Sequence, residues 1–435
     1  MKCARWISIC ILISLGSPIG RAVESTPSGS GEQAVGDLAV VYAAKFGYDP
    51  ADATRALQAA IDSGARKVVV ENLGTPWIVN PIRLAGDQEV FFEKGVVVEA
   101  KRGGFKGTND CLFTAVLKKN VTLNGEGATF RMWKKDYLGP DYRKAEWRHC
   151  VSVRSCTNVM IYGLTLAGSG GDGIYLGVER NDLTDTNVEI KKVTCIDNSR
   201  QGISVVSAEN LVIEDCWLRD TAGTAPEAGI DIEPNEATDR LVNIAVRGCV
   251  SENNHGNGFC LYLPHLTAHS AGVSIRFANC RTEGCVYGVV VETGNSADDA
   301  AWGGIDFVNC TFKRSGHAGI IIKKPATGCA LRFERCDITD AATEFPREAP
   351  IGLESKKGDT ELAGGVEFAD CRVKDTMERA PLFFRNMGGS SFEKIARITG
   401  NLEVMRGELD AKYTLDDPLT YAWAFRKPVP KGAGQ

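Results

Sequence analysis

The stretch LVIEDCWLRDTAGTAPEAGIDI, residues 211–232, decides the fold of this chain because its pattern returns along the sequence. In it, an alternating apolar strand runs into a cysteine, and a glycine later opens a second apolar-x-apolar strand. The same phrase occurs at 244–261 (IAVRGCVSENNHGNGFCL) and at 275–291 (IRFANCRTEGCVYGVVV). The cysteines at this repeat position are Cys216, Cys249, Cys280, Cys310, Cys336 and Cys371, at steps of 33, 31, 30, 26 and 35 residues.

A supersecondary unit that recurs every 30 or so residues cannot bury its apolar face alone, so it stacks on its neighbours. Two or three short strands per unit, with almost no helical periodicity, predict an all-β fold, a single-stranded right-handed parallel β-helix. One helix is expected over Asp52–Ser63, with Asp52 as its N-cap, and it would cover the N-terminal end of the core. Its apolar face would consist of Ala56, Leu57, Ala60 and Ile61.

Composition and charge set broad limits on function. The chain has 435 residues, of which 43% are hydrophobic and 24% are charged, and its formal net charge is −5. These values suit either one elongated solenoid domain or two ordinary domains. The mild acidity gives no reason to expect a nucleic acid as the partner.

The N-terminus has the pattern of a secretory signal peptide. Lys2 and Arg5 precede an apolar core from Trp6 to Leu15, and small residues follow at the expected cleavage positions. The core is too short to span a bilayer, and no later segment approaches a membrane span, so we expect a periplasmic or secreted protein. Four segments are predicted: signal peptide 1–22, linker 23–36, β-helix domain 37–392, and C-terminal cap and tail 393–435.

The cysteines of an exported protein raise the question of disulfides. Of 15 cysteines, Cys3 and Cys10 fall in the predicted signal peptide, which leaves 13. Residues at one repeat position stack about 4.8 Å apart with parallel Cβ directions, and this is poor geometry for a disulfide. The pattern therefore favours a column of buried thiols that pack as small apolar side chains.

An aromatic and charged insertion interrupts the repeats at 131–148. It contains Trp133, Tyr137, Tyr142 and Trp147 and is too polar for a core segment. Two interpretations are open: the insertion lies beside a binding face, or it is a solvated loop.

Three segments resemble a known protein group. They are DATRALQAAID from Asp52, NVTLNGEG at 120–127 and CTNVMIYGLTL at 156–166. Together they are similar to the N-terminal half of the pectin-lyase-like superfamily, which includes polygalacturonases, pectate lyases and uncharacterised exported β-helix proteins. The resemblance covers roughly residues 37–390 and implies a carbohydrate as the substrate.

When the coils are aligned on the glycine that opens the second strand, alternate side chains point to opposite faces. The outward pairs are then Tyr175/Gly177, Ser204/Val206, Asp231/Glu233, Cys260/Tyr262, Val290/Glu292 and Ile321/Lys323. The position before the glycine holds Asp172, Gln201, Ala228, Asn257, Tyr287 and, on the same alignment, His149.

Asp231 and Glu233 give the sharpest signal for chemistry. They lie two residues apart and share one face, with backbone positions about 6.7 Å apart. A glycosidase needs two carboxyl groups, and separations of roughly 6.5–9.5 Å suit an inverting reaction. Asp172, two coils earlier, is the candidate partner or a hydroxyl acceptor. A cation site and a solvated acidic surface are the alternatives.

The polygalacturonase motifs match this chain only in part. Asp172, in Gly-Gly-Asp-Gly, stands at the place of the first motif, and His255 is an echo of the Gly-His-Gly motif one coil late. The Gly-Asp-Asp and Arg-Ile-Lys motifs have no counterpart. A three-histidine metal site from His255, His265 and His269 lacks the fixed spacing that such a site needs.

Further residues are candidates for substrate contact. Tyr175 and Tyr262 could stack on sugar rings, and Arg200 could neutralise a uronate carboxylate. The full set of predicted substrate-binding residues is His149, Tyr175, Arg200, Gln201, His255, Asn257, Tyr262 and Glu292.

The sequence therefore predicts an exported carbohydrate-active enzyme, with a glycoside hydrolase as the first hypothesis and Asp231, Glu233 and Asp172 as its catalytic residues. The partner would be a polysaccharide or oligosaccharide. The first alternative is a polysaccharide lyase or epimerase on a uronate polymer, with Ca²⁺ held by Asp231 and Glu233. The second is a non-catalytic carbohydrate-binding rod.

Overall fold

The computed structural model describes residues 39–181, 183–294, 299–323, 326, 328–355, 365–377, 379–386, 398–406 and 409–414. The predicted signal peptide and linker lie outside these residues, and so does most of the predicted C-terminal tail. Among the described residues, no helix is both long and apolar enough to cross a membrane.

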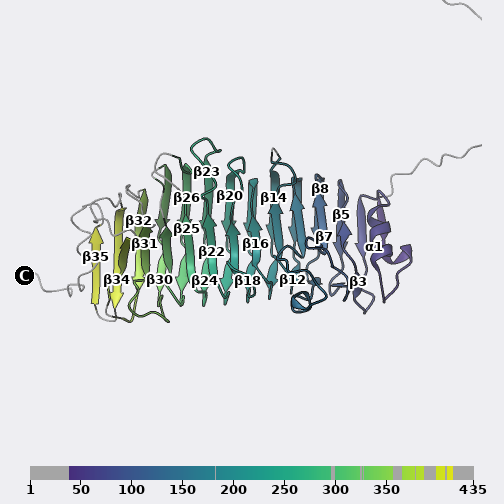
Figure 1. Cartoon of the computed structure of the whole chain (residues 1–435), viewed down its shortest axis with the longest axis horizontal. Helices are drawn as coiled ribbons and strands as arrows, with labels where there is room; N and C mark the ends of the chain where they lie inside the picture. Colours follow the sequence, from purple (N-terminus) through teal and green to yellow (C-terminus); the bar gives the residue numbers. More distant parts are fainter. Residues whose placement is uncertain are drawn as a thin grey trace, which may run out of the picture. The chain divides into compact units, whose positions relative to one another are not determined.

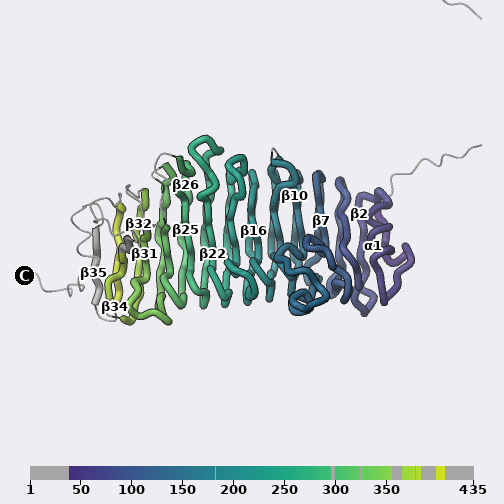
Figure 2. Tube along the Cα trace, in the orientation of Figure 1, coloured from purple at the N-terminus to yellow at the C-terminus, as the bar shows by residue number. Residues whose placement is uncertain are grey.

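The described chain is a right-handed parallel β-helix in which each coil adds up to three strands to those of the coil before (Figures 1 and 2). The long strands are β1 (Val40–Tyr42), β2 (Lys67–Val70), β5 (Gln88–Phe92), β8 (Lys119–Asn124), β11 (Thr157–Tyr162), β14 (Asp185–Lys191), β17 (Ala208–Glu214), β20 (Leu241–Arg247), β23 (Val273–Ala278), β26 (Gly303–Val308), β29 (Cys329–Glu334), β32 (Val366–Lys374) and β34 (Ile398–Arg406). The short strands that follow most of them are β3 (Trp77–Val79), β6 (Val97–Ala100), β9 (Thr129–Arg131), β12 (Thr165–Ala167), β15 (Thr194–Ile196), β18 (Trp217–Arg219), β21 (Val250–Glu252), β24 (Arg281–Glu283), β27 (Thr311–Lys313) and β30 (Asp337–Thr339). The last described strand, β35 (Leu409–Thr414), pairs antiparallel with β34.

The remaining strand of each coil belongs to an 11-stranded parallel sheet, within the described residues. Its members are β4 (Ile82–Arg83), β7 (Phe113–Val116), β10 (Val151–Arg154), β13 (Ile174–Gly177), β16 (Gln201–Val205), β19 (Ala228–Ile232), β22 (Asn257–Tyr262), β25 (Tyr287–Glu292), β28 (Ile320–Lys323), β31 (Ile351–Ser355) and β33 (Leu382–Asn386). This sheet carries the glycine-opened strands of the repeat, so the predicted fold class is confirmed.

The core is a stack of inward side chains in register. Ile174 pairs with Ile203, which pairs with Ile230, and none of the three is exposed. Aromatic rings stack in the same way farther along, with Phe307 4.8 Å from Phe277 and 4.9 Å from Phe333 between ring centroids. These spacings match the distance of about 4.8 Å between neighbouring strands, so each inward residue packs on its equivalent in the next coil.

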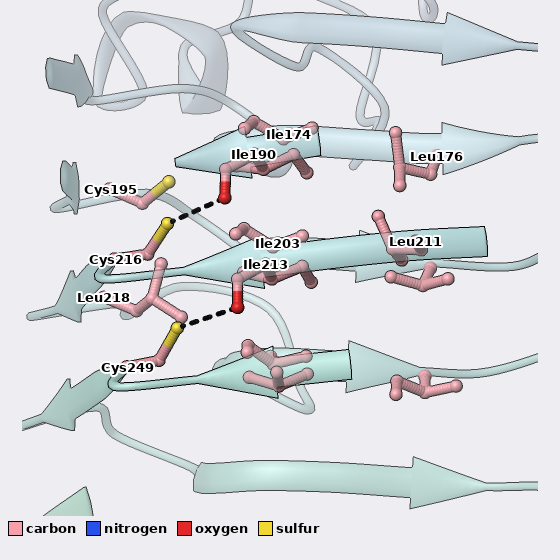
Figure 3. Packing of buried hydrophobic residues seen from close by; sticks show 14 of the residues in the cluster. Ile174, Leu176, Ile190, Cys195, Ile203, Leu211, Ile213, Cys216, Leu218 and Cys249 are labelled. Carbon is pink, nitrogen blue, oxygen red and sulfur yellow. Dashed lines mark hydrogen bonds between the residues drawn. The ribbon is translucent and has the colours of Figure 1, made fainter. Parts of the chain in front are cut away.

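The predicted column of buried thiols is present. All 13 cysteines among the described residues are free and buried. In Figure 3 the thiol of Cys216 donates to the carbonyl of Ile190 (3.7 Å), and the thiol of Cys249 donates to the carbonyl of Ile213 (3.6 Å). Each thiol therefore fills a core position and also satisfies a backbone carbonyl of the preceding coil.

The N-terminal helix α1 (Thr54–Ile61) lies at the first coil (Figure 1) and is shorter than predicted at both ends. Its N-cap is Ala53, not Asp52, and it is preceded by the 3₁₀ helix η1 (Ala43–Phe46). The Asp52 carboxylate still accepts the Thr54 backbone N–H (3.1 Å), but it also pairs with Lys101 (2.6 Å), and this draws it away from the cap position. The buried residues are the predicted Ala56, Leu57, Ala60 and Ile61.

One row of outward side chains runs along the 11-stranded sheet, and we call it the outward row. In register it contains Thr114, Ser152, Tyr175, Ser204, Asp231, Cys260, Val290, Ile321 and Gly352. The predicted register is confirmed, but most of these side chains are buried. The outward face is not free because loops and long side chains of the coils lie over it.

Candidate active site

A cluster of carboxylates surrounds one arginine over strands β13, β16 and β19. Asp172 lies two residues before β13 and Arg200 directly before β16. Asp231 lies in β19, and Glu233 directly follows that strand. Because the three strands are neighbours in register, residues from positions 172 to 233 converge on one place. The fourth carboxylate, Glu146, comes from the insertion at 131–148.

Asp231 is completely buried, with an exposed fraction of 0%. The Gln201 side-chain amide donates to its Oδ2 atom at 2.6 Å, and Arg200 donates in turn to the Gln201 oxygen at 3.1 Å. In register, Asp231 lies between Ser204 and Cys260. The predicted outward acid is therefore sealed from solvent.

Burial raises the pKa of Asp231 to about 7, and repulsion from Glu233 adds to this shift. The Arg200 charge and the Cys260 and Gln201 side chains oppose the rise without cancelling it. Desolvation penalises the ionised form of a carboxyl group. At neutral pH a substantial fraction of the molecules therefore keeps a proton on this carboxyl group inside the cluster.

Arg200 joins the members of the cluster. Its Nη2 atom lies 3.1 Å from the Glu233 carboxylate, and its Nε atom lies 3.5 Å from that of Glu146. Burial opposes the guanidinium charge, but attraction to Asp172, Asp231, Glu233 and Glu146 outweighs it and raises the pKa of Arg200. The Glu233 side chain is 31% exposed, so it is the surface member of the predicted acid pair.

His149 and Asp172 form a second buried contact beside Arg200. The His149 ring stacks on Tyr175 with 4.7 Å between centroids and an angle of 5°. Its Nδ1 atom accepts the Asp172 backbone N–H at 2.9 Å and lies 3.2 Å from the Asp172 carboxylate. Burial raises the pKa of Tyr175 to about 12, which keeps its hydroxyl protonated.

The other predicted residues lie on the next two coils, in or just before β22 and at the end of β25. Asn257 opens β22 and Tyr262 ends it, and Tyr262 is in register with Glu292, which is buried at the end of β25. His255 is exposed in the turn before β22, and no hydrogen bond to another described residue joins its ring to the cluster. The structure thus gathers His149, Asp172, Tyr175, Arg200, Gln201, Asp231 and Glu233 and leaves the others beside them.

Sequence reasoning missed three residues. Glu146 pairs with Arg200 from an insertion that has no repeat position, so no periodic signal marks it. Cys260 touches Asp231 from the next coil, and its place in the outward row does signal this contact. His317 stands at the repeat position of Arg200, stacks on Tyr287 at 4.9 Å and places Nδ1 2.9 Å from the Glu348 carboxylate.

No three histidine, cysteine, aspartate or glutamate residues gather in a way that could hold a metal ion, as far as the described residues go. Asp231 and Glu233 have Arg200 next to them, which occupies the place that a cation would take. The cluster contains one buried acid with a raised pKa, Asp231, and one surface carboxylate, Glu233, two residues apart. Environments that separate the protonation of two acids in this way suit general acid–base chemistry.

Comparison with known proteins agrees with the fold. A family described as "Right handed beta helix region" matches residues 143–297, which include every predicted site residue. The uncharacterized protein YclG of Bacillus subtilis is 26% identical over 151 residues, covering 32% of this chain and 25% of that protein. The match thus spans about a quarter of the length of this curated relative.

Several solved structures share the architecture. A tailspike protein double mutant of E. coli bacteriophage HK620, in complex with a pentasaccharide, is 15% identical and covers 83% of this chain and 65% of its own (TM-score 0.56). PfbA, a surface adhesin of Streptococcus pneumoniae, is 12% identical, and the match covers 87% of this chain and 100% of PfbA (TM-score 0.53). An exopolygalacturonase from Thermotoga maritima is 12% identical, and the match covers 87% of this chain and 95% of that enzyme (TM-score 0.50). The chain therefore has the right-handed parallel β-helix fold that the resemblance implied.

Proposed function

We propose that this chain is a carbohydrate-active enzyme, a glycoside hydrolase whose acid–base pair is Asp231 and Glu233. The observation that carries the proposal is the buried Asp231, whose pKa of about 7 lets it donate a proton at neutral pH. Glu233, paired with Arg200 and open to solvent, is the carboxylate that would act on water. The two residues start from backbone positions about 6.7 Å apart along a strand, and an inverting reaction needs their carboxyl groups about 6.5–9.5 Å apart, with a water between them.

The proposed reaction requires that the Arg200 side chain moves. Arg200 and Gln201 separate Asp231 from solvent. Within the described residues, the Arg200 guanidinium donates to the Gln201 and Glu233 side chains and forms an ion pair with Glu146. A sugar that contacts Glu233 competes for the same guanidinium and would uncover the acid. Catalytic hydrogen bonds often form only in the substrate complex, so a sealed acid in the free chain is compatible with this role.

Asp172 has a supporting role in this proposal. It is the carboxylate whose charge contributes most to the raised pKa of Arg200, and its backbone N–H fixes the His149 ring. A bound sugar hydroxyl would find two acceptor oxygens there, because neither oxygen of Asp172 accepts a hydrogen bond from the described residues.

The test is an assay on plant and algal polysaccharides that records reducing ends and ultraviolet absorbance together. We expect reducing ends without the absorbance of an unsaturated uronate. Asp231→Asn and Glu233→Gln should each lower kcat about 10²–10⁴-fold, the range of general acid–base catalysis. Glu189→Gln, on β14 and paired with Lys191, is the matched control and should leave kcat unchanged. Wild-type turnover in both site variants would overturn the proposal.

A polysaccharide lyase or epimerase acting on a uronate polymer is the second candidate, and Arg200 favours it. A guanidinium next to a surface carboxylate can neutralise a substrate carboxylate before a proton is removed at carbon. Reducing ends that rise together with ultraviolet absorbance would select the lyase. Sensitivity of that signal to EDTA would add Ca²⁺ to the mechanism.

A non-catalytic carbohydrate-binding rod is the third candidate, and the complete burial of Asp231 favours it. This reading predicts saccharide binding without any product. Binding that survives Asp231→Asn but falls in Tyr175→Ala or Tyr262→Ala would select it.

We also propose that the chain is exported, on the charged, apolar and small-residue pattern of residues 1–22. Expression with the native N-terminus in a bacterial host should give a mature protein outside the cytoplasm whose sequence starts at Val23. A cytoplasmic protein that retains Met1 would contradict this.

A further inference from the structure

A pocket of about 530 Å³ lies between the insertion at 131–148 and the turns that precede β13, β16 and β19. Its lining includes Leu138, Tyr142, Glu146 and Trp147 from the insertion, and Ser199 and Thr224 from the turns. The mixture of aromatic, apolar and hydrogen-bonding side chains is typical of small-molecule sites.

The walls of this pocket are held in place by two basic side chains of the insertion. Lys134 reaches across to the Asp197 carboxylate at 2.7 Å and donates to the Ala222 carbonyl at 2.9 Å. Arg148 is fully buried and donates to the Phe105 carbonyl at 2.9 Å. Both ends of the insertion are therefore fixed to the β-helix, and the pocket needs no ligand to form.

Two exposed apolar side chains belong to the lining of this pocket. Leu138 is 83% exposed and Trp147 is 48% exposed, and both belong to the same lining. Tyr142 stands at 72° to Tyr137, with 5.2 Å between the ring centroids, and this contact supports the wall from behind. Single exposed apolar residues are ordinary on a protein surface, whereas two in one preformed pocket indicate a ligand.

The pocket is continuous with the carboxylate cluster. Glu146 lines the pocket and also pairs with Arg200 at 3.5 Å. Ser199, another lining residue, directly precedes Arg200 in the chain. A ligand in the pocket therefore lies beside the proposed acid pair.

We infer that this pocket is a saccharide subsite that holds one pyranose ring of the substrate next to the bond that the carboxylates cleave. The Trp147 indole offers a flat apolar surface to the CH face of the ring. The Glu146 carboxylate and the Thr224 hydroxyl can bind the hydroxyl groups at the ring edge. The identity of the ligand rests on the proposed function, whereas the pocket itself does not.

The test is calorimetric titration of the full chain with two probes, the anionic hexagalacturonate and the neutral cellohexaose. At least one should bind the wild type, and Trp147→Ala should weaken that binding about 10-fold, a change of about 1.4 kcal/mol. Trp147→Phe should restore part of the affinity because it keeps a flat ring. Trp217→Ala is the matched control, since Trp217 is 42% exposed on β18, which belongs to another sheet.

The inference is overturned if neither hexasaccharide binds the wild type, or if Trp147→Ala and Trp217→Ala bind alike. Its failure can be told apart from failure of the proposed function. Binding that depends on Trp147, without product from any polymer, would sustain the subsite and remove the hydrolase. Product formation by the wild type, together with unchanged saccharide affinity in Trp147→Ala, would support the hydrolase and overturn the subsite.

Discussion

The outward row of the 11-stranded sheet differs between two regions, strands β10–β19 and strands β25–β31. In the first region the row holds Ser152, Tyr175, Ser204 and Asp231, and in the second it holds Val290, Ile321 and Gly352. The inward residues of both regions are the same kind of buried aliphatic side chain, such as Ile203 and Ile320. The backbone and the core thus stay constant while the outward row changes, so under the proposed function we expect the chemistry in that row.

The layer over the sheet differs in the same sense. Over β13–β19 it is the Arg200 guanidinium with Glu146 and Glu233. Near β25 and β28 the His317 ring stacks on Tyr287 at 4.9 Å and on Phe345 at 3.9 Å. A charged layer that can exchange partners therefore covers the acids, while an aromatic layer is associated with the apolar part of the row.

The largest effect is expected when the outward residues of the two regions are exchanged. Val290→Asp should lower the free energy of unfolding by about 3–5 kcal/mol at pH 8, because its register neighbours Cys260 and Ile321 offer no charge partner. Asp231→Val should abolish turnover but leave the free energy of unfolding at pH 8 unchanged or higher, because it removes a buried carboxyl group.

Urea unfolding at pH 8 measures both effects of this exchange. Val290→Thr keeps the branched shape and adds a buried but uncharged hydroxyl, so it separates the cost of burying a polar group from the cost of burying a charge. Equal destabilisation by Val290→Asp and Asp231→Val would contradict the view that the two regions have different environments.

The register of the outward row was predictable from the sequence, but the burial of its side chains was not. Glycine and period-two alternation placed Asp231 between Ser204 and Cys260, because every coil repeats one strand geometry. The burial of Asp231 depends on the Arg200 side-chain conformation and on Glu146, which comes from an insertion outside the repeat. Neither has a periodic signal. The helix ends were also misplaced, since Asp52 pairs with Lys101 from a distant coil.

The inward residues allow a second test, in which the two regions should behave alike. Ile203→Ala and Ile320→Ala should each cost about 2–5 kcal/mol of unfolding free energy, because both side chains are completely buried in a stacked core. KM and kcat per folded molecule should not change in either variant. Chemical denaturation and activity assays measure this, and a difference between the two costs larger than about 2 kcal/mol would show that the cores are not equivalent.

The pH dependence of stability gives a third test. The unfolded chain loses the Asp231 proton near the ordinary aspartate value of 3.8, whereas the folded chain keeps it to about pH 7. The folded state then binds more protons between these values, so the free energy of unfolding should fall as pH rises, by at most about 1.4 kcal/mol per pH unit for one group. Asp185, whose pKa burial raises to about 8, should add a similar decline that continues to about pH 8.

Thermal and urea unfolding from pH 4 to pH 9 measure this decline. Asp231→Asn should remove one part of it and Asp185→Asn the other, whereas Val290→Thr in the apolar region should leave the full slope. A slope that survives in the double variant would assign it to other groups. The sign is diagnostic, since acids stabilised in the ionised form would make the chain more stable as pH rises.

The smallest expected effect comes from the cysteine column, which runs through both regions. Cys249→Ala and Cys336→Ala each remove a buried sulfur and its hydrogen bond to a carbonyl of an earlier coil, 3.6 Å for Cys249 and 3.3 Å for Cys336. We expect a loss of about 1 kcal/mol in each, since a thiol is a weak donor and the cavity is small. Because the column belongs to the core and not to the outward row, the two losses should agree, and neither variant should alter saccharide binding. A maleimide reagent should modify none of the buried thiols in the native chain, and rapid labelling of Cys249 alone would show that the region with the acids opens more readily than the apolar one.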